Sequence, residues 1–255
     1  MQNYSNNNLK MKIAFCFLTY DKIIRYDIWN KFLNGIDIEK YTVIIHPKNI
    51  NNWNYYTFPY TIVKDRINTT GKDNITIVKA TLKLFNEAFK QKATHYIFLS
   101  QSCIPIYTFD ILYNIVSNVK YSIISCINNN KTERFNSLSN QLKQIVKLNN
   151  FVKQQPNMIL IKEDIELLLK NDFTEHFKIM QCPDEHYFIN VLINIFKINL
   201  IKKQTHFCNF NLNRTQALEY KYIDINFIKK IRDFGFLFMR KIREDTIIDI
   251  DYLFN

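Results

Sequence analysis

The N-terminal part of the chain alternates short apolar runs with segments whose apolar residues recur at helical spacing. Residues 12–18 and 41–45 form nearly continuous apolar runs, which are typical of strands covered on both faces. Between them, Ile28 and Phe32 recur at helical spacing, and Gly35 is a typical helix stop. A strand, a helix and a strand within about 35 residues predict a parallel α/β unit with a right-handed crossover.

The same alternation continues toward the C-terminus. The polar segment 128–150 has weak apolar periodicity and is expected to be a mobile loop or a joint. Residues 1–11 are expected to be a disordered arm, and residues 12–255 a single domain. The pattern predicts further strands at 96–99, 121–126, 157–161 and 235–239, and further helices at 74–90, 109–116, from 161 to 168, 187–195 and 223–231.

Charge and glycine content restrict the class of ligand. The formal net charge of +11 suits an anionic partner, but Lys and Arg are spread along the chain instead of forming a block. This favours a phosphate-bearing ligand such as a nucleotide sugar over nucleic acid, and a basic nucleic-acid-binding module is the alternative from another class. The 3 glycines, Gly35, Gly71 and Gly235, are too far apart for a dinucleotide-binding fingerprint or a P-loop.

Cysteine usage and hydropathy bear on the compartment. The 5 cysteines are an odd number, and several lie inside apolar runs where buried thiols are usual, which favours a reducing compartment. The first residues lack the order of a secretory signal, and no apolar run approaches the ~20 residues that span a bilayer. We expect a soluble protein, cytoplasmic or viral, with no membrane span in this chain.

Two adjacent carboxylates and a histidine precede the apolar helical segment 187–195. Asp184 is in a good position to be its N-cap, and Glu185 in the first turn would complement the helix dipole. Alternatively, Glu185 is a general base that takes a proton from an acceptor hydroxyl. A helix N-terminus lowers the pKa of a carboxyl group, so burial would have to offset the dipole for a base that works near neutrality.

Several groups of residues are candidate metal sites by their residue types. The turn formed by Ser100, Gln101 and Ser102 follows an expected strand, where many nucleotide-sugar transferases carry Asp-x-Asp for a divalent cation. In this chain both acid positions are occupied by serines, Ser100 and Ser102. Other acid-x-acid matches, at 37–39, 164–166 and 249–251, are expected on solvated faces. The candidate zinc ligands Cys182, His186, His206, Cys208 and His176 match no common zinc spacing.

Without a cation, side chains must balance the charge of a diphosphate. Arg240 and Lys241 come directly after the apolar segment 236–239 and could stabilise a developing negative charge there. A basic pair at a strand end is otherwise a common surface feature. Together with the hydroxyl turn, it favours a site without metal.

Five segments, in this order, resemble the core-2/I-branching β-1,6-N-acetylglucosaminyltransferases (glycosyltransferase family 14), in particular plant-type or viral-like members. The resemblance implies a GT-A-like, Rossmann-type, mostly parallel sheet with flanking helices. It also implies a UDP-sugar donor such as UDP-GlcNAc, a glycan or glycoprotein acceptor, inversion at the anomeric carbon and no metal or other cofactor. The segments are 12–19 (KIAFCFLT), 45–47 (IHP), 99–105 (LSQSCIP), 183–187 (PDEHY) and 237–241 (LFMRK).

Alternatives of the same fold are a xylosyltransferase, another glycosyltransferase, or an inactive relative that only binds glycans. Cellular relatives are usually Golgi enzymes with an N-terminal anchor, so a Golgi location would require anchoring by another component.

By that resemblance Glu185 falls on the catalytic base, and residues 12–127 and 150–255 form the nucleotide-sugar half and the acceptor and catalytic half. The family often has Ser-Gln-Trp where this chain has 154–157 (QQPN), and a His-Pro pair expected after Phe210 is missing. Both departures concern presumed acceptor contacts, for which the candidates are Asp184 and Gln155. The residues implied to bind the donor are Lys241, Arg240, Lys221, Thr19, His46, Ser100, Gln101 and Ser102.

Overall fold

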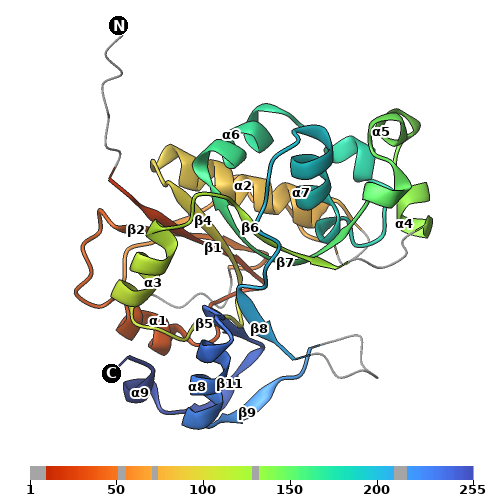
Figure 1. Cartoon of the computed structure of the whole chain (residues 1–255). Coiled ribbons are helices and arrows are strands. Elements are labelled where there is room, and N and C mark those ends of the chain that lie inside the picture. The colour runs from red at the N-terminus through yellow and green to blue at the C-terminus, as the bar shows by residue number, and fades with distance from the viewer. Residues whose placement is uncertain (1–9, 51–55, 71–73, 128–131, 210–216, 255) are drawn as a thin grey trace, which may run out of the picture.

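The computed structural model describes residues 10–50, 56–70, 74–127, 132–209 and 217–254, so residues 1–9 of the expected arm lie outside it. A six-stranded sheet forms the centre of the molecule (Figure 1). Its first four strands are parallel, whereas β7 runs antiparallel to both of its neighbours. The strand order is β3 (Thr61–Ile62), β2 (Tyr41–Pro47), β1 (Ile13–Thr19), β4 (His95–Ser100), β7 (Lys153–Ile161) and β6 (Ile123–Ile127). The predicted α/β class with a mostly parallel sheet is confirmed.

Helices cover both faces of this sheet, which explains the continuous apolar runs of its strands (Figure 1). Along β1, Ala14 and Cys16 belong to one core, and Phe15 and Phe17 belong to the other. The first core contains residues of α2 (Thr76–Lys90), α6 (Lys162–Lys170) and α7 (Tyr187–Asn190), and the second contains residues of α1 (Tyr26–Leu33) and α3 (Phe109–Ser117).

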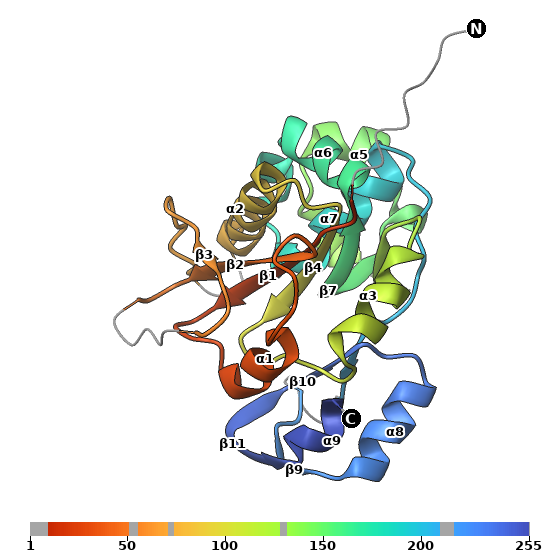
Figure 2. The same ribbon diagram turned by 90° about the vertical axis from the view of Figure 1, so that its left-hand side faces the viewer.

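The C-terminal elements pack beneath α1 and form a third core (Figure 2). In this core Ile28 of α1 lies with Met239 and Leu253. β10 (Phe238–Arg240) pairs with β5 (Ile104–Pro105) on one side and β8 (His206–Cys208) on the other. The remaining elements are β9 (Tyr220–Ile223), α8 (Ile225–Asp233), β11 (Ile242–Ile248) and α9 (Ile250–Phe254). No helix in the described part of the chain is long and apolar enough to cross a membrane.

Several predicted boundaries were wrong. The expected loop at 128–150 contains short helices, because Leu138, Leu142 and Val146 recur every four residues and are buried; residues 128–131 lie outside the described residues. β7 begins at Lys153 instead of 157, and the late strand is 238–240 instead of 235–239. The short helices of this segment are α4 (Thr132–Asn136), α5 (Asn140–Ile145) and a 3-10 turn at Leu148–Asn150. Another 3-10 turn lies at Thr174–Phe177, and a π-helical turn at Val191–Ile195 continues α7.

Trp29 links helix α1 to the sheet and to the loop after β4. Its ring packs edge-on against Phe17, with 4.8 Å between centroids, and its Nε1 donates a hydrogen bond of 2.9 Å to the carbonyl of Cys103. Replacing Trp29 with Ala is therefore expected to lower the free energy of unfolding by about 3–5 kcal/mol. Urea denaturation measures this change. Tyr222→Ala, at a side chain that is 65% exposed, is the control and should change it by less than about 0.5 kcal/mol.

Candidate active site

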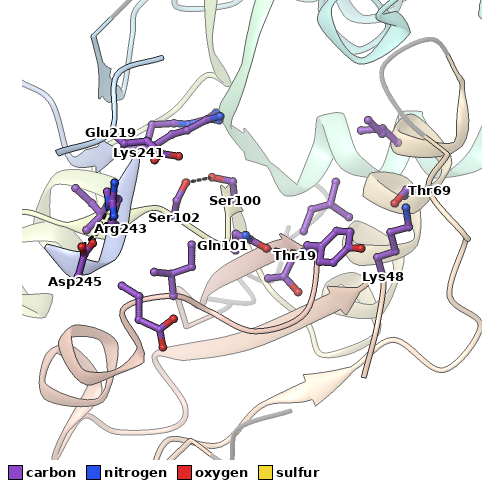
Figure 3. Close-up of a pocket in the computed structure, with 17 residues that line it drawn as sticks. Thr19, Lys48, Thr69, Ser100, Gln101, Ser102, Glu219, Lys241, Arg243 and Asp245 are labelled. Atoms are coloured by element: carbon purple, nitrogen blue, oxygen red, sulfur yellow. Dashed lines mark hydrogen bonds and ion pairs between the residues drawn. The ribbon is translucent and has the colours of Figure 1, made fainter. Parts of the chain in front are cut away.

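A cavity of about 950 Å³, here called the main cavity, lies where β1 and β4 end (Figure 3). Residues 240–245, from the end of β10 and the start of β11, form its opposite wall. In open α/β sheets, ligands bind in the crevice outside the carboxyl ends of the strands. The position of the main cavity therefore makes it the candidate binding site.

The turn after β4 is held in place from two sides of the main cavity. The Oε1 of Gln101 accepts a hydrogen bond of 2.6 Å from the N–H of Tyr20, and the carbonyl of Gln101 accepts one of 3.0 Å from the N–H of Ile24. The carbonyl of Ser102 accepts a hydrogen bond of 3.1 Å from the N–H of Ile242. The hydroxyls of Ser100 and Ser102 lie 3.3 Å apart (Figure 3). These bonds fix two hydroxyl groups in the wall of the cavity.

An aromatic side chain that was not identified from the sequence also lines the main cavity. Tyr20 directly follows β1, is 58% exposed and lines the cavity, and the Nζ of Lys48 lies 5.4 Å from the centroid of its ring. Thr19 also lines the cavity, but its hydroxyl donates a hydrogen bond of 3.0 Å to the carbonyl of Asp21. An exposed aromatic residue directly after a buried strand was the available signal for Tyr20.

The basic pair lines the main cavity, as Arg240 and Lys241 both contribute to its wall. The Nη1 of Arg240 donates a hydrogen bond of 3.4 Å to the Oδ1 of Asn157, and its buried Nε has no hydrogen-bond partner among the described residues. Arg243 lies on the same wall, where Asp245 pairs with it at 2.7 Å. Arg240 and Lys241 thus bring positive charge to the cavity, whereas the charge of Arg243 is matched locally.

Four candidate residues line neither cavity described here: His46, Lys221, Gln155 and Glu185. His46 is fully buried, and its Nε2 accepts a hydrogen bond of 2.9 Å from the N–H of Ile67; burial lowers the pKa of this imidazole. Lys221 is exposed on β9. Gln155 is half-buried on β7, where its carbonyl accepts a hydrogen bond of 3.4 Å from the Nε2 of Gln154.

Glu185 forms an ion pair with a residue far away in the sequence. Its Oε2 lies 2.6 Å from the Nζ of Lys153, the first residue of β7. Lys153 was not identified from the sequence, because the strand was expected to start at 157. The predicted capping role of Asp184 was wrong: Pro183 starts a 3-10 turn, so the N-cap of Pro183–Glu185 is Cys182 and that of α7 is His186.

Buried polar groups attach α7 to the beginning of β7. The Nδ1 of His186 donates a hydrogen bond of 3.1 Å to the carbonyl of Val152, which also accepts one of 2.8 Å from the Nδ2 of Asn190. The Oε1 of Gln154 accepts a hydrogen bond of 2.7 Å from the N–H of Ile189. Because buried polar groups must be satisfied, these bonds define the position of the turn that carries Asp184 and Glu185.

A smaller cavity of about 160 Å³, here called the side cavity, adjoins the main cavity and shares Ser100 and Arg240 with it. Asp184 lines the side cavity together with apolar side chains that include Phe98 and Phe188. Burial raises the pKa of Asp184 to about 6, and the neighbouring charge of Glu185 acts in the same direction. Lys153 acts against this rise.

The candidate metal ligands form no metal site among the described residues. No group of three or more His, Cys, Asp or Glu residues that could hold a metal ion occurs in the described ranges. His206, for example, is buried and stacks on Phe238, and its Nδ1 forms a hydrogen bond of 2.9 Å with the hydroxyl of Thr205. The expectation that 164–166 is a solvated face was wrong for Asp164, which is buried and accepts a hydrogen bond of 2.5 Å from Ser122.

A family model described as "Core-2/I-Branching enzyme" matches residues 13–232. No curated protein matches the chain significantly. A solved cytidylyltransferase from Leptospira borgpetersenii is 12% identical, with 95% of this chain and 92% of that chain covered and a TM-score of 0.37. The galactosyltransferase LgtC with donor and acceptor sugar analogs is 11% identical, with 94% and 85% covered and a TM-score of 0.45. The bifunctional glycosyltransferase WbbM is 8% identical, with 91% and 46% covered and a TM-score of 0.40. TM-scores this low carry no argument about function.

Proposed function

Because this chain belongs to the Core-2/I-Branching enzyme family, it is a glycosyltransferase, and we propose that it transfers a sugar from a UDP-sugar to a glycan hydroxyl with inversion and without a metal ion. The observation that carries this proposal is the main cavity itself. It combines the hydroxyls of Ser100 and Ser102, in the place of an acid pair, with the side chains of Arg240 and Lys241. The resemblance of the sequence motifs to β-1,6-N-acetylglucosaminyltransferases supports UDP-GlcNAc as the donor.

In the proposed reaction Glu185 removes the proton from the acceptor hydroxyl. The acceptor oxygen then attacks the anomeric carbon from the face opposite the leaving group, and the bond from that carbon to the β-phosphate oxygen breaks. The electron pair of this bond leaves with UDP. Arg240 and Lys241 would stabilise the charge that develops on the diphosphate, a task that divalent cations perform in other transferases. Their place in the wall of the main cavity supports this role.

The positions of Tyr20 and Asp184 support an orientation for the nucleotide sugar. The aromatic ring of Tyr20 offers a surface for a base. The Nζ of Lys48 lies 5.4 Å from the centroid of this ring, and Figure 3 shows Lys48 across the cavity from Lys241. Asp184 lines the side cavity, so Glu185 is one residue away from a cavity wall. A nucleotide sugar laid along the main cavity would then direct its sugar toward this turn.

A panel of UDP-GlcNAc, UDP-glucose and UDP-xylose tests the proposed function. The expected result is release of UDP that depends on the protein and on a glycan acceptor, with a glycosylated product identified by mass spectrometry. Heat-denatured protein is the control. If the folded protein neither binds UDP nor releases it from any of these donors, the proposed function is wrong.

Treatment with EDTA is expected to leave the transfer rate unchanged within about twofold, because side-chain cations take the charge of the diphosphate. The measurement compares initial rates before and after chelation, with a metal-dependent glycosyltransferase assayed in parallel as the control. Complete loss of activity in EDTA, restored by Mn²⁺ or Mg²⁺, would contradict metal-independent transfer.

A further inference from the structure

The side cavity has one acid and one base among its lining residues, Asp184 and Arg240. The remaining wall is mostly apolar and includes Leu18, Phe98 and Phe188. Ligand sites commonly combine apolar walls with a small number of polar groups that set the orientation of the ligand. Asp184 is the acid of this lining, and the proposed reaction gives it no task, since Glu185 is the proposed base.

We propose that the side cavity holds the pyranose ring of the transferred sugar, and that Asp184 is a specificity-determining residue that accepts a hydrogen bond from a hydroxyl of that ring. This inference rests on the proposed function of the main cavity. It adds the location of the donor sugar and the chemical class of the sugar, and it gives Asp184 a donor contact in place of the predicted acceptor contact.

Arg240 determines the position of the sugar in this scheme. It lines both cavities, and the sugar of a nucleotide sugar is attached directly to the β-phosphate. If Arg240 contacts the diphosphate, the sugar must lie next to that contact, and the side cavity is the adjoining space. At about 160 Å³ this space suits one monosaccharide, whereas the main cavity of about 950 Å³ has room for a nucleoside diphosphate.

The charge around Asp184 determines which sugars fit. Glu185 faces it from the same turn, Lys153 from β7 and Arg240 from the end of β10. An ionised Asp184 accepts strong hydrogen bonds from hydroxyl groups but repels a second carboxylate. The transferred sugar is therefore a neutral one and not a uronic acid.

Titration of Asp184 makes this contact depend on pH. Burial and the charge of Glu185 raise its pKa to about 6, so the carboxylate dominates above pH 6 and the neutral acid below it. The charge-assisted hydrogen bond to the sugar is thus present at pH 7.5 and is lost as the pH falls through 6. UDP alone lacks the sugar, so its affinity does not depend on this carboxyl; its terminal phosphate titrates in the same pH range, a contribution that is also present in the Asp184→Asn protein.

The test compares the Kd of UDP with that of UDP-GlcNAc, UDP-glucose and UDP-glucuronic acid by calorimetry, on the full chain without acceptor, at pH 5.0, 6.0 and 7.5. For a neutral sugar at pH 7.5, the ratio of the Kd of UDP to that of the UDP-sugar is expected to be about tenfold higher in the unmodified protein than in Asp184→Asn. At pH 5.0 the two proteins should show the same ratio, because Asp184 is then neutral. Asp110→Asn, at an exposed residue in the first turn of α3, is the matched control and should behave as the unmodified protein.

The outcomes separate this inference from the proposed function. If UDP binds but the unmodified protein and Asp184→Asn show the same ratio at all three pH values, the assignment of Asp184 is wrong and the proposed function survives. Tighter binding of UDP-glucuronic acid than of both neutral UDP-sugars would likewise overturn it. If UDP itself does not bind, the proposed function fails.

Discussion

Replacing Glu185 with Gln is expected to lower kcat by about 10²- to 10⁴-fold, because the amide cannot take the proton of the acceptor hydroxyl. Donor affinity should change by less than about threefold, since Glu185 is assigned to the proton and not to the nucleotide sugar. Initial rates at saturating donor and acceptor measure the first effect, and calorimetric titration with UDP-sugar measures the second.

The control for this substitution is Glu175→Gln. Glu175 is also an ion-paired glutamate that lines neither cavity, with Lys178 at 3.0 Å, but unlike Glu185 it does not adjoin a residue that lines one. Its replacement should leave kcat unchanged. Full turnover by the Glu185→Gln protein, with an unchanged melting temperature, would show that another group is the base.

Replacing Lys241 with Met is expected to lower kcat/KM by about 10²-fold, because one of the two cations assigned to the leaving diphosphate is removed. Methionine keeps much of the apolar length of the side chain, so the change mainly concerns charge. Steady-state kinetics with a UDP-sugar as donor measures the effect.

Lys230→Met, at an exposed lysine in the last turn of α8, is the matched control and should leave kcat/KM within about twofold. The same loss in both variants would show that the overall charge of the protein is responsible and not the place of Lys241 in the cavity wall.

The buried strands of the sheet were predictable from the sequence, whereas in the C-terminal region β8, β9 and β11 were not and β10 was predicted with the wrong bounds. β1 and β2 are covered on both faces, so their apolar runs were clear. β11 has only some of its side chains buried and contains the charged stretch 243–245, so it carried no apolar signal. Short strands such as β8 and β10 owe their pairing to each other and to β5, which local patterns do not describe.

The same distinction applies to the residues of the candidate site. The sequence alone determined the hydroxyl turn at Ser100 to Ser102, the basic pair Arg240 and Lys241, and the adjacent acids Asp184 and Glu185, because each is a local pattern. Only the tertiary structure decided that Lys153 meets Glu185, that Asp184 lines a cavity with Arg240, and that His46 is buried away from both cavities. Strand order and the antiparallel insertion of β7 bring these distant residues together, and such long-range pairing depends on how the whole sheet packs, which local spacing does not encode.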